Sequence, residues 1–92
     1  MHHYIALIED SGPDTAVGVW FPDLPGCFSA GDTFEEALLN AEEALALYAE
    51  ATALPPPRSL ADLKRDPEVA ADIAAHIVAA IPFRPRVRPA AE

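Results

Sequence analysis

One segment, Phe21–Ala51, constrains the fold of this chain more than any other, because a tight reversal, a short strand and a long helix follow one another within it. Pro22, Pro25 and Gly26 produce the reversal, since proline fixes φ and glycine alone enters positive φ without strain. An apolar strand therefore has to end just before the reversal. A second short strand is predicted to start at about Cys27.

A long helix is predicted over residues 34–52. Thr33 and Glu36 have the spacing of a capping box, in which side chains at the start of the helix satisfy its free backbone N–H groups. The core face of this helix is an apolar stripe, whose members recur at alternating steps of about four and three residues: Phe34, Leu38, Ala41, Leu45, Tyr48 and Thr52. The prolines at 55–57 exclude its continuation.

A neighbouring face of the same helix is acidic. A rotation of about 100° per residue brings together Glu35, Glu42, Glu43 and Glu50, with Leu39 and Ala46 among them. Such a face is either a docking surface for a basic partner or a solvated surface whose carboxylates only keep the domain soluble. The residue pattern alone leaves both interpretations open.

The remaining elements complete an α+β pattern of the order β-β-β-α-(α)-β. The predicted strands cover 3–9, 16–21, 27–30 and 77–83, a short helix begins at Ser59 with Asp62 at its capping position, and a further helical segment covers 68–75. We expect a three-stranded antiparallel meander, a crossover helix and a fourth strand parallel to the first. One helix layer leaves the second sheet face thinly covered, although Ile5, Leu7 and Trp20 lie there. We therefore expect a homo-oligomer, either a dimer or a tetramer.

Charge is distributed unevenly along the 92 residues, which carry 15 acidic and 6 basic side chains and a net charge of -9. Residues 1–57 contain no Lys or Arg, and all the basic residues lie between Arg58 and Arg88. This surface repels phosphate backbones, so we expect no direct nucleic acid binding and a basic protein as partner. We expect one domain over 1–83 and a mobile, basic, proline-containing tail over 84–92.

The N-terminus lacks the basic and apolar regions of a signal peptide, no apolar run is long enough to cross a membrane, and Cys27 has no partner for a disulfide within the chain. The expected compartment is the cytoplasm, without membrane association.

Catalytic chemistry is not indicated by the residue pattern. A ribonuclease H-like nuclease needs carboxylates from several elements around two metal ions. Here Glu9 and Asp10 lie near the end of the first strand, and the last strand supplies no carboxylate. Cys27 is interpreted as a small buried residue, and Asp23 as a stabiliser of its own turn. We therefore predict no catalytic residue, no metal site and no cofactor.

Two separated turn signatures and a helix start carry a resemblance to a known family. The sequences Phe-Pro-Asp-Leu-Pro-Gly-Cys-Phe at 21–28 and Gly-Asp-Thr-Phe-Glu-Glu-Ala-Leu at 31–38, followed by Asn-Ala-Glu-Glu-Ala-Leu at 40–45, resemble the N-terminal domain of HicB-type antitoxins. The motif positions are Phe21, Pro22, Asp23, Pro25, Gly26, Gly31, Asp32, Thr33 and Glu36. The resemblance extends over nearly the whole chain and implies a degenerate ribonuclease H-like fold.

The resemblance further implies an antitoxin that works by binding HicA, a small basic RNA-cleaving toxin. We expect the toxin to contact an acidic set made of Glu9, Asp10, Asp14, Glu35, Leu39, Glu42, Glu43 and Glu50. Complete HicB antitoxins commonly carry a C-terminal DNA-binding segment, and only the arginine-containing tail stands at that place here. The alternatives are an orphan HicB-like interaction or scaffold module without a toxin partner, and a residual metal-dependent nuclease.

Overall fold

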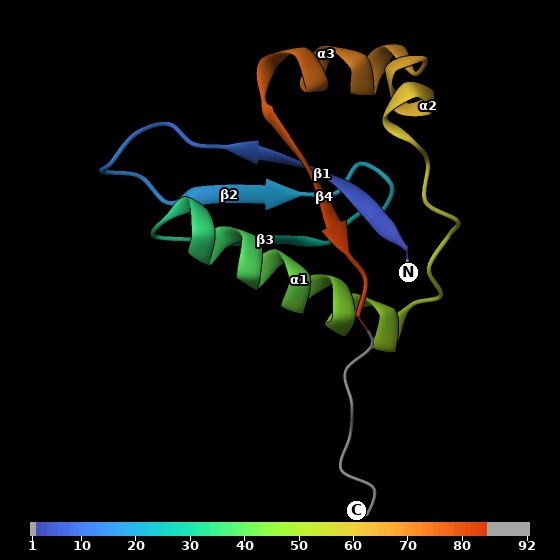
Figure 1. The fold of residues 1–92 in the computed structure, drawn as a ribbon, viewed down its shortest axis with the longest axis horizontal. Helices are drawn as coiled ribbons and strands as arrows, with labels where there is room; N and C mark the ends of the chain where they lie inside the picture. Colours follow the sequence, from blue (N-terminus) through green and yellow to red (C-terminus); the bar gives the residue numbers. More distant parts are fainter. Residues whose placement is uncertain (1, 85–92) are drawn as a thin grey trace, which may run out of the picture.

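A four-stranded antiparallel sheet forms the centre of the computed structural model, in which residues 2–84 are described (Figure 1). The strands are β1 (His3–Glu9), β2 (Val17–Trp20), β3 (Phe28–Gly31) and β4 (Ile77–Pro82), in the spatial order β3-β2-β1-β4. The α+β class and the N-terminal meander are confirmed. The predicted tail lies outside the described residues from 85 onward.

Helix α1 (Phe34–Ala51) packs across one face of the sheet, and its start is fixed as predicted. The Thr33 hydroxyl accepts the backbone N–H of Glu36 at 3.1 Å, and the Glu36 carboxylate accepts the N–H of Asp32 at 2.9 Å. The side chains that α1 buries in the main core are Ala37, Ala41 and Leu45, with Phe34, Leu38 and Tyr48 packed at its margin. Thr52, predicted on this stripe, is instead the exposed C-cap residue.

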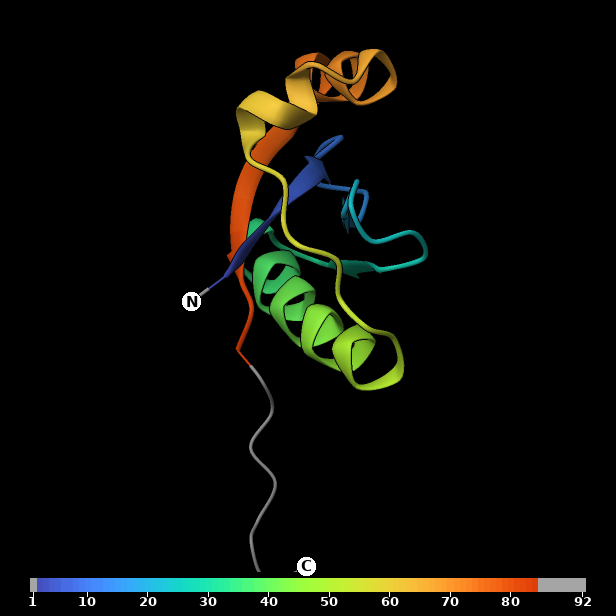
Figure 2. The same ribbon diagram turned by 90° about the vertical axis from the view of Figure 1, so that its right-hand side faces the viewer.

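The second sheet face is only partly covered by α2 (Leu60–Lys64) and α3 (Pro67–Ala75), which lie on the side of the strands away from α1 (Figures 1 and 2). Leu7, which points to this face, and Leu63 of α2 are both fully buried. The rest of this face is less covered, since Phe28 is 72% exposed, Ile5 and Trp20 are half-buried, and α3 has no buried residue. The prediction of a thinly covered second face therefore agrees with the structure. The residues of α2 and α3 were expected to be helical, but sequence alone did not place them over the sheet.

Strand β4 runs antiparallel to β1, which corrects the predicted parallel arrangement. The end of α1 returns the chain to the end of the sheet where β1 begins. Residues 53–59, followed by α2 and α3, then carry the chain across the second face to the opposite end (Figure 2). Ile77 therefore pairs with Ile8 and Pro82 with His3, so the crossover rule for parallel strands does not apply.

Candidate functional site

The motif turn after β2 consists of two consecutive reversals. The backbone N–H of Leu24 donates to the carbonyl of Phe21 at 3.1 Å, and the N–H of Cys27 donates to the carbonyl of Leu24 at 3.0 Å. Gly26 has a φ of 84°, which explains the glycine at this position. Phe21, Leu24 and Cys27 are all buried, so the turn anchors itself in the core.

Asp23 connects this turn to a distant part of the chain. Its carboxylate accepts the Nε–H of Arg58 at 2.6 Å and the backbone N–H of Arg58 at 2.9 Å, and the Asp23 side chain is only 7% exposed. The hydrogen bond and the nearby negative charge raise the pKa of Arg58. Sequence reasoning assigned Asp23 to stabilising its own turn. The structure shows a tertiary anchor instead.

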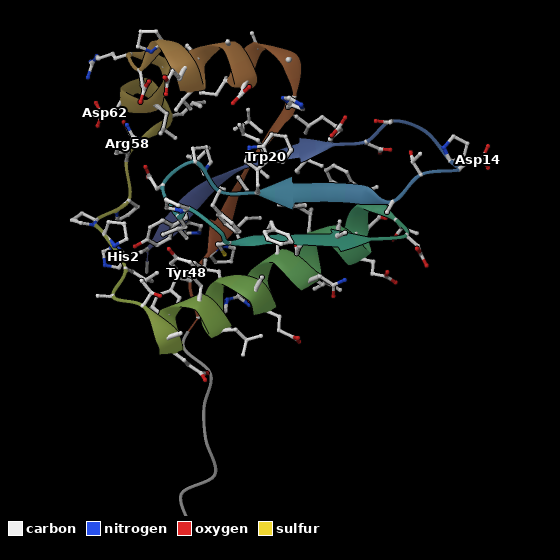
Figure 3. All side chains as sticks on the ribbon, turned by 180° about the vertical axis from the view of Figure 1, so that it is seen from behind. His2, Asp14, Trp20, Tyr48, Arg58 and Asp62 are labelled. Carbon is white, nitrogen blue, oxygen red and sulfur yellow. The ribbon has the colours of Figure 1, made fainter. Side chains whose placement is uncertain are left out.

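Residues 53–59, which we call the proline strap, are held at one further point. The Tyr4 hydroxyl donates to the carbonyl of Pro55. The Tyr48 hydroxyl donates to the carbonyl of Pro25 at 3.1 Å and so ties α1 to the motif turn that the strap contacts through Arg58. Burial, with a smaller effect of the Asp23 charge, raises the pKa of Tyr4. The motif turn, α1 and the strap therefore form one connected unit, in which Arg58 and Tyr48 lie on the side seen in Figure 3.

Gly31 in the second motif allows β3 to meet the start of α1 at close range. A Cβ atom at this position would lie 2.6 Å from the backbone nitrogen of Ala37 and 2.9 Å from its Cα. Both atoms belong to the backbone, so only glycine fits without a shift of the helix. The two family motifs are thus explained by how they place α1 on the sheet, and they supply no group to a reactive centre.

The acidic residues of α1 surround an exposed leucine. Leu39 is 70% exposed, and together with Glu42, Glu43, Ala46 and Arg84 it lines a shallow hollow of about 480 Å³. Arg84 Nη1 lies 3.4 Å from Glu42 Oε1, which is a partly exposed ion pair. We call the set Glu35, Leu39, Glu42, Glu43 and Glu50 the α1 acidic face. Ala46, expected on that face, is buried.

The acidic residues at the end of β1 and in the β1–β2 loop, which we call the loop acids, form a separate group. Glu9 and Asp10 line a hollow of about 350 Å³ with His76 and Ile77, at the end of the sheet where β4 begins. Asp14 lies at the tip of the loop, away from the helices (Figure 3). The structure therefore does not bring the whole predicted acidic set onto one surface. It places the α1 acidic face and the loop acids at different ends of β4.

An apolar groove between α1 and β4 was missed by the sequence analysis. It has a volume of about 420 Å³, with Leu38, Leu39, Ala79, Ala80, Ile81 and Pro82 along it and Glu35 and Glu42 at its margin. The sequence analysis did not predict this groove, because it placed β4 in the wrong direction and did not predict which residues of β4 lie beside α1. The available signal was the apolar pattern at every second position of 77–83, which predicted the strand itself.

Groups that could perform chemistry are engaged in packing. Burial raises the pKa of the Cys27 thiol, which makes its thiolate less available. His76 follows α3, and its ring packs edge-on against Trp20 with 4.8 Å between ring centroids. Within residues 2–84, no three His, Cys, Asp or Glu side chains gather in a way that could hold a metal ion, and no helix is long and apolar enough to cross a membrane.

Comparison with known families matches residues 4–85 to the HicB_like antitoxin of bacterial toxin-antitoxin systems. The chain belongs to this family. A chain in the structure of the HicA3 and HicB3 toxin-antitoxin complex is 31% identical, with a TM-score of 0.68, and the match covers 90% of the present chain and 99% of that one. The N-terminal domain of the Burkholderia pseudomallei antitoxin HicB has the same fold, at 24% identity, a TM-score of 0.70 and coverage of 89% and 98%.

Two sequence relatives match part of this HicB-like chain. An uncharacterised 14.9 kDa protein from the rep-hol intergenic region of Haemophilus phage HP1 is 66% identical over 47 residues, which are 51% of this chain and 34% of the phage protein. The UPF0150 protein ssr1765 of Synechocystis is 44% identical over 50 residues, which are 54% of this chain and 62% of that protein. The matches thus cover about a third and somewhat under two thirds of these relatives.

Proposed function

We propose that this HicB-like chain is an antitoxin that binds and neutralises a small, basic, RNA-cleaving toxin of the HicA type through the α1 acidic face. The observation that carries the proposal is Leu39, an exposed apolar side chain next to Glu35, Glu42 and Glu43 on a helix without any basic residue. Family membership and the likeness to a chain of the HicA3 and HicB3 complex support it.

Charge and apolar contact have different roles in this proposal. The toxin has to bind RNA, so its surface is basic and is attracted by these carboxylates. This attraction mainly raises the association rate. Burial of Leu39 against the partner mainly lowers the dissociation rate. The loop acids Glu9, Asp10 and Asp14 lie apart from α1, so we assign them to long-range attraction at most.

The activity we propose is binding, without catalysis and without cofactor. We further propose that the protein acts in the cytoplasm and forms a homo-oligomer, a dimer or a tetramer. Phe28, which is 72% exposed on β3, supports a further protein contact outside α1. Light scattering coupled to size-exclusion chromatography gives the subunit number.

The test is co-expression with the tagged product of an adjacent gene for a small basic protein, followed by co-purification and a growth assay. A stable complex that restores growth is expected. The double substitution Glu42→Lys with Glu43→Lys should weaken the complex. The control Glu68→Lys with Asp72→Lys on α3 changes the net charge equally and should not weaken it.

If no neighbour binds and no toxicity exists to be relieved, the chain is an orphan interaction module. A complex that both double variants weaken equally places the contact elsewhere.

A further inference from the structure

The two edges of the sheet differ in how they are protected. At the β3 edge, the carbonyl of Ala30 is occupied by the side chain of Asn40, whose Nδ2 donates to it at 2.8 Å. At the β4 edge, the strand Ile77–Pro82 has no charged side chain, and Ile77 is 46% exposed. Natural sheets usually guard a free apolar edge with charges, bulges or a covering element. Within the described residues, this edge is protected mainly by Pro82 at the end of β4.

The backbone register identifies the groups that β4 presents outward. The N–H of Phe83 donates to the carbonyl of His2 at 2.8 Å, which makes this a hydrogen-bonded pair. Hydrogen-bonded and non-bonded pairs alternate along an antiparallel ladder. The backbone N–H and C=O groups of Val78 and Ala80 therefore point away from β1, toward the free edge.

The groove between β4 and α1 lies directly beside this edge. Its apolar part is formed by Leu38 and Leu39 with residues 79–82, and its margin carries the carboxylates of Glu35 and Glu42. These two glutamates are seven positions apart on α1, which is about 10 Å along a helix axis. An extended chain covers that distance with about three residues.

We infer that the β4 edge and this groove bind an extended basic segment of the toxin partner by strand addition. The added strand pairs with the outward groups of Val78 and Ala80 and inserts an apolar side chain beside Leu39. It places Lys or Arg side chains near Glu35 and near Glu42, where the incoming cation takes the place of Arg84. This inference rests on the proposed function. It adds the mode of binding and the chemistry of the segment that is recognised.

Charge decides between a basic partner and a second copy of the chain. A two-fold pairing of β4 with another β4 brings two grooves together, and with them the glutamates of both α1 helices. Each copy also carries a net charge of -9. A basic strand removes this repulsion and replaces it with attraction.

The inference is tested with Ala80→Pro, which removes an outward N–H and leaves the pairing with β1 intact. Proline is tolerated in an edge strand where its missing N–H faces outward. Ala80→Val is the matched control, because it keeps the N–H and suits a strand. Circular dichroism and thermal unfolding establish that both variants fold. The probe is the HicA-type protein co-purified with the wild-type chain, and affinity is measured by calorimetry.

We expect Ala80→Pro to weaken binding at least about tenfold and Ala80→Val to change it less than about threefold. Hydrogen exchange should show the amides of Val78 and Ala80 protected in the wild-type complex and open in the free chain. A folded Ala80→Pro variant that binds like wild type, or amides that stay open in the complex, overturns strand addition while leaving the antitoxin function in place.

Two other results are distinguishable. If Ala80→Pro lowers the subunit number of the free chain and leaves toxin affinity unchanged, the edge pairs with a second copy and the inference is wrong. If the wild-type chain binds no such toxin, the proposed function fails and the inference fails with it. If Ala80→Pro does not fold, the hydrogen exchange of the wild-type complex alone decides.

Discussion

Replacement of Asp23 by alanine should destabilise the domain by about 2 kcal/mol, because this carboxylate makes two hydrogen bonds to Arg58 while being 7% exposed. The bond from the Arg58 backbone N–H to a carboxylate contributes about 1.5 kcal/mol. The ion pair with the guanidinium adds a smaller amount, because the Arg58 side chain is 40% exposed to solvent. In a domain of this size, the sum lowers Tm by roughly 8 to 16 °C.

The assay is thermal and urea unfolding of Asp23→Ala, Arg58→Ala and the double variant. Arg58→Ala should cost less than Asp23→Ala, since it keeps the backbone N–H bond to Asp23 and loses only the guanidinium. Asp62→Ala is the control, because Asp62 forms an exposed ion pair with Arg65 at 2.6 Å and should cost at most about 0.5 kcal/mol. If Asp23→Ala costs no more than Asp62→Ala, the proline strap is not held by this pair and the reasoning is wrong.

Two further predictions concern the motif glycine and the strap. Gly31→Ala should destabilise the fold by about 1 to 3 kcal/mol, because the new Cβ meets the Ala37 backbone at 2.6 Å, whereas Gly18→Ala has no atom within 4 Å and should be neutral or stabilising in urea unfolding. Tyr4→Phe should cost about 1 kcal/mol at neutral pH through loss of the bond to the Pro55 carbonyl. Burial raises the pKa of Tyr4 above its ordinary 10.0. The contribution of Tyr4 to the free energy of unfolding is therefore complete below about pH 10 and is lost as the pH rises through the folded-state pKa. If Tyr4→Phe loses as much stability at alkaline pH as the wild type does, this assignment is wrong.

Local rules predicted the elements of this fold well. The three N-terminal strands lie at or within about one residue of their predicted limits, and the caps at Thr33 and Ser59 form the expected bonds to Glu36 and Asp62. These features depend on turn residues, side-chain alternation and capping, all of which act between residues close in sequence.

Long-range features were beyond those rules. The direction of β4 depends on how far residues 53–75 travel before the strand begins, and no local pattern encodes that distance. Asp23 illustrates the same limit, because its partner Arg58 is 35 positions away and an aspartate in a turn has an obvious local role. The predicted acidic set likewise grouped residues from their positions in the sequence alone. In the folded protein these residues lie on two separate surfaces.

The register of β4 has a consequence for the synthesis of the chain. β1 is an internal strand whose second neighbour is β4, the last element of the described residues, since His3 pairs with Pro82. While the chain leaves the ribosome, the meander and α1 can assemble early, but one side of β1 stays bare until residues 77–82 have emerged. A chain cut anywhere in the proline strap or in the helices that follow it is therefore left with an exposed apolar strand edge. We expect such fragments to aggregate or to be degraded, so that only chains that include residues 77–82 accumulate as folded protein.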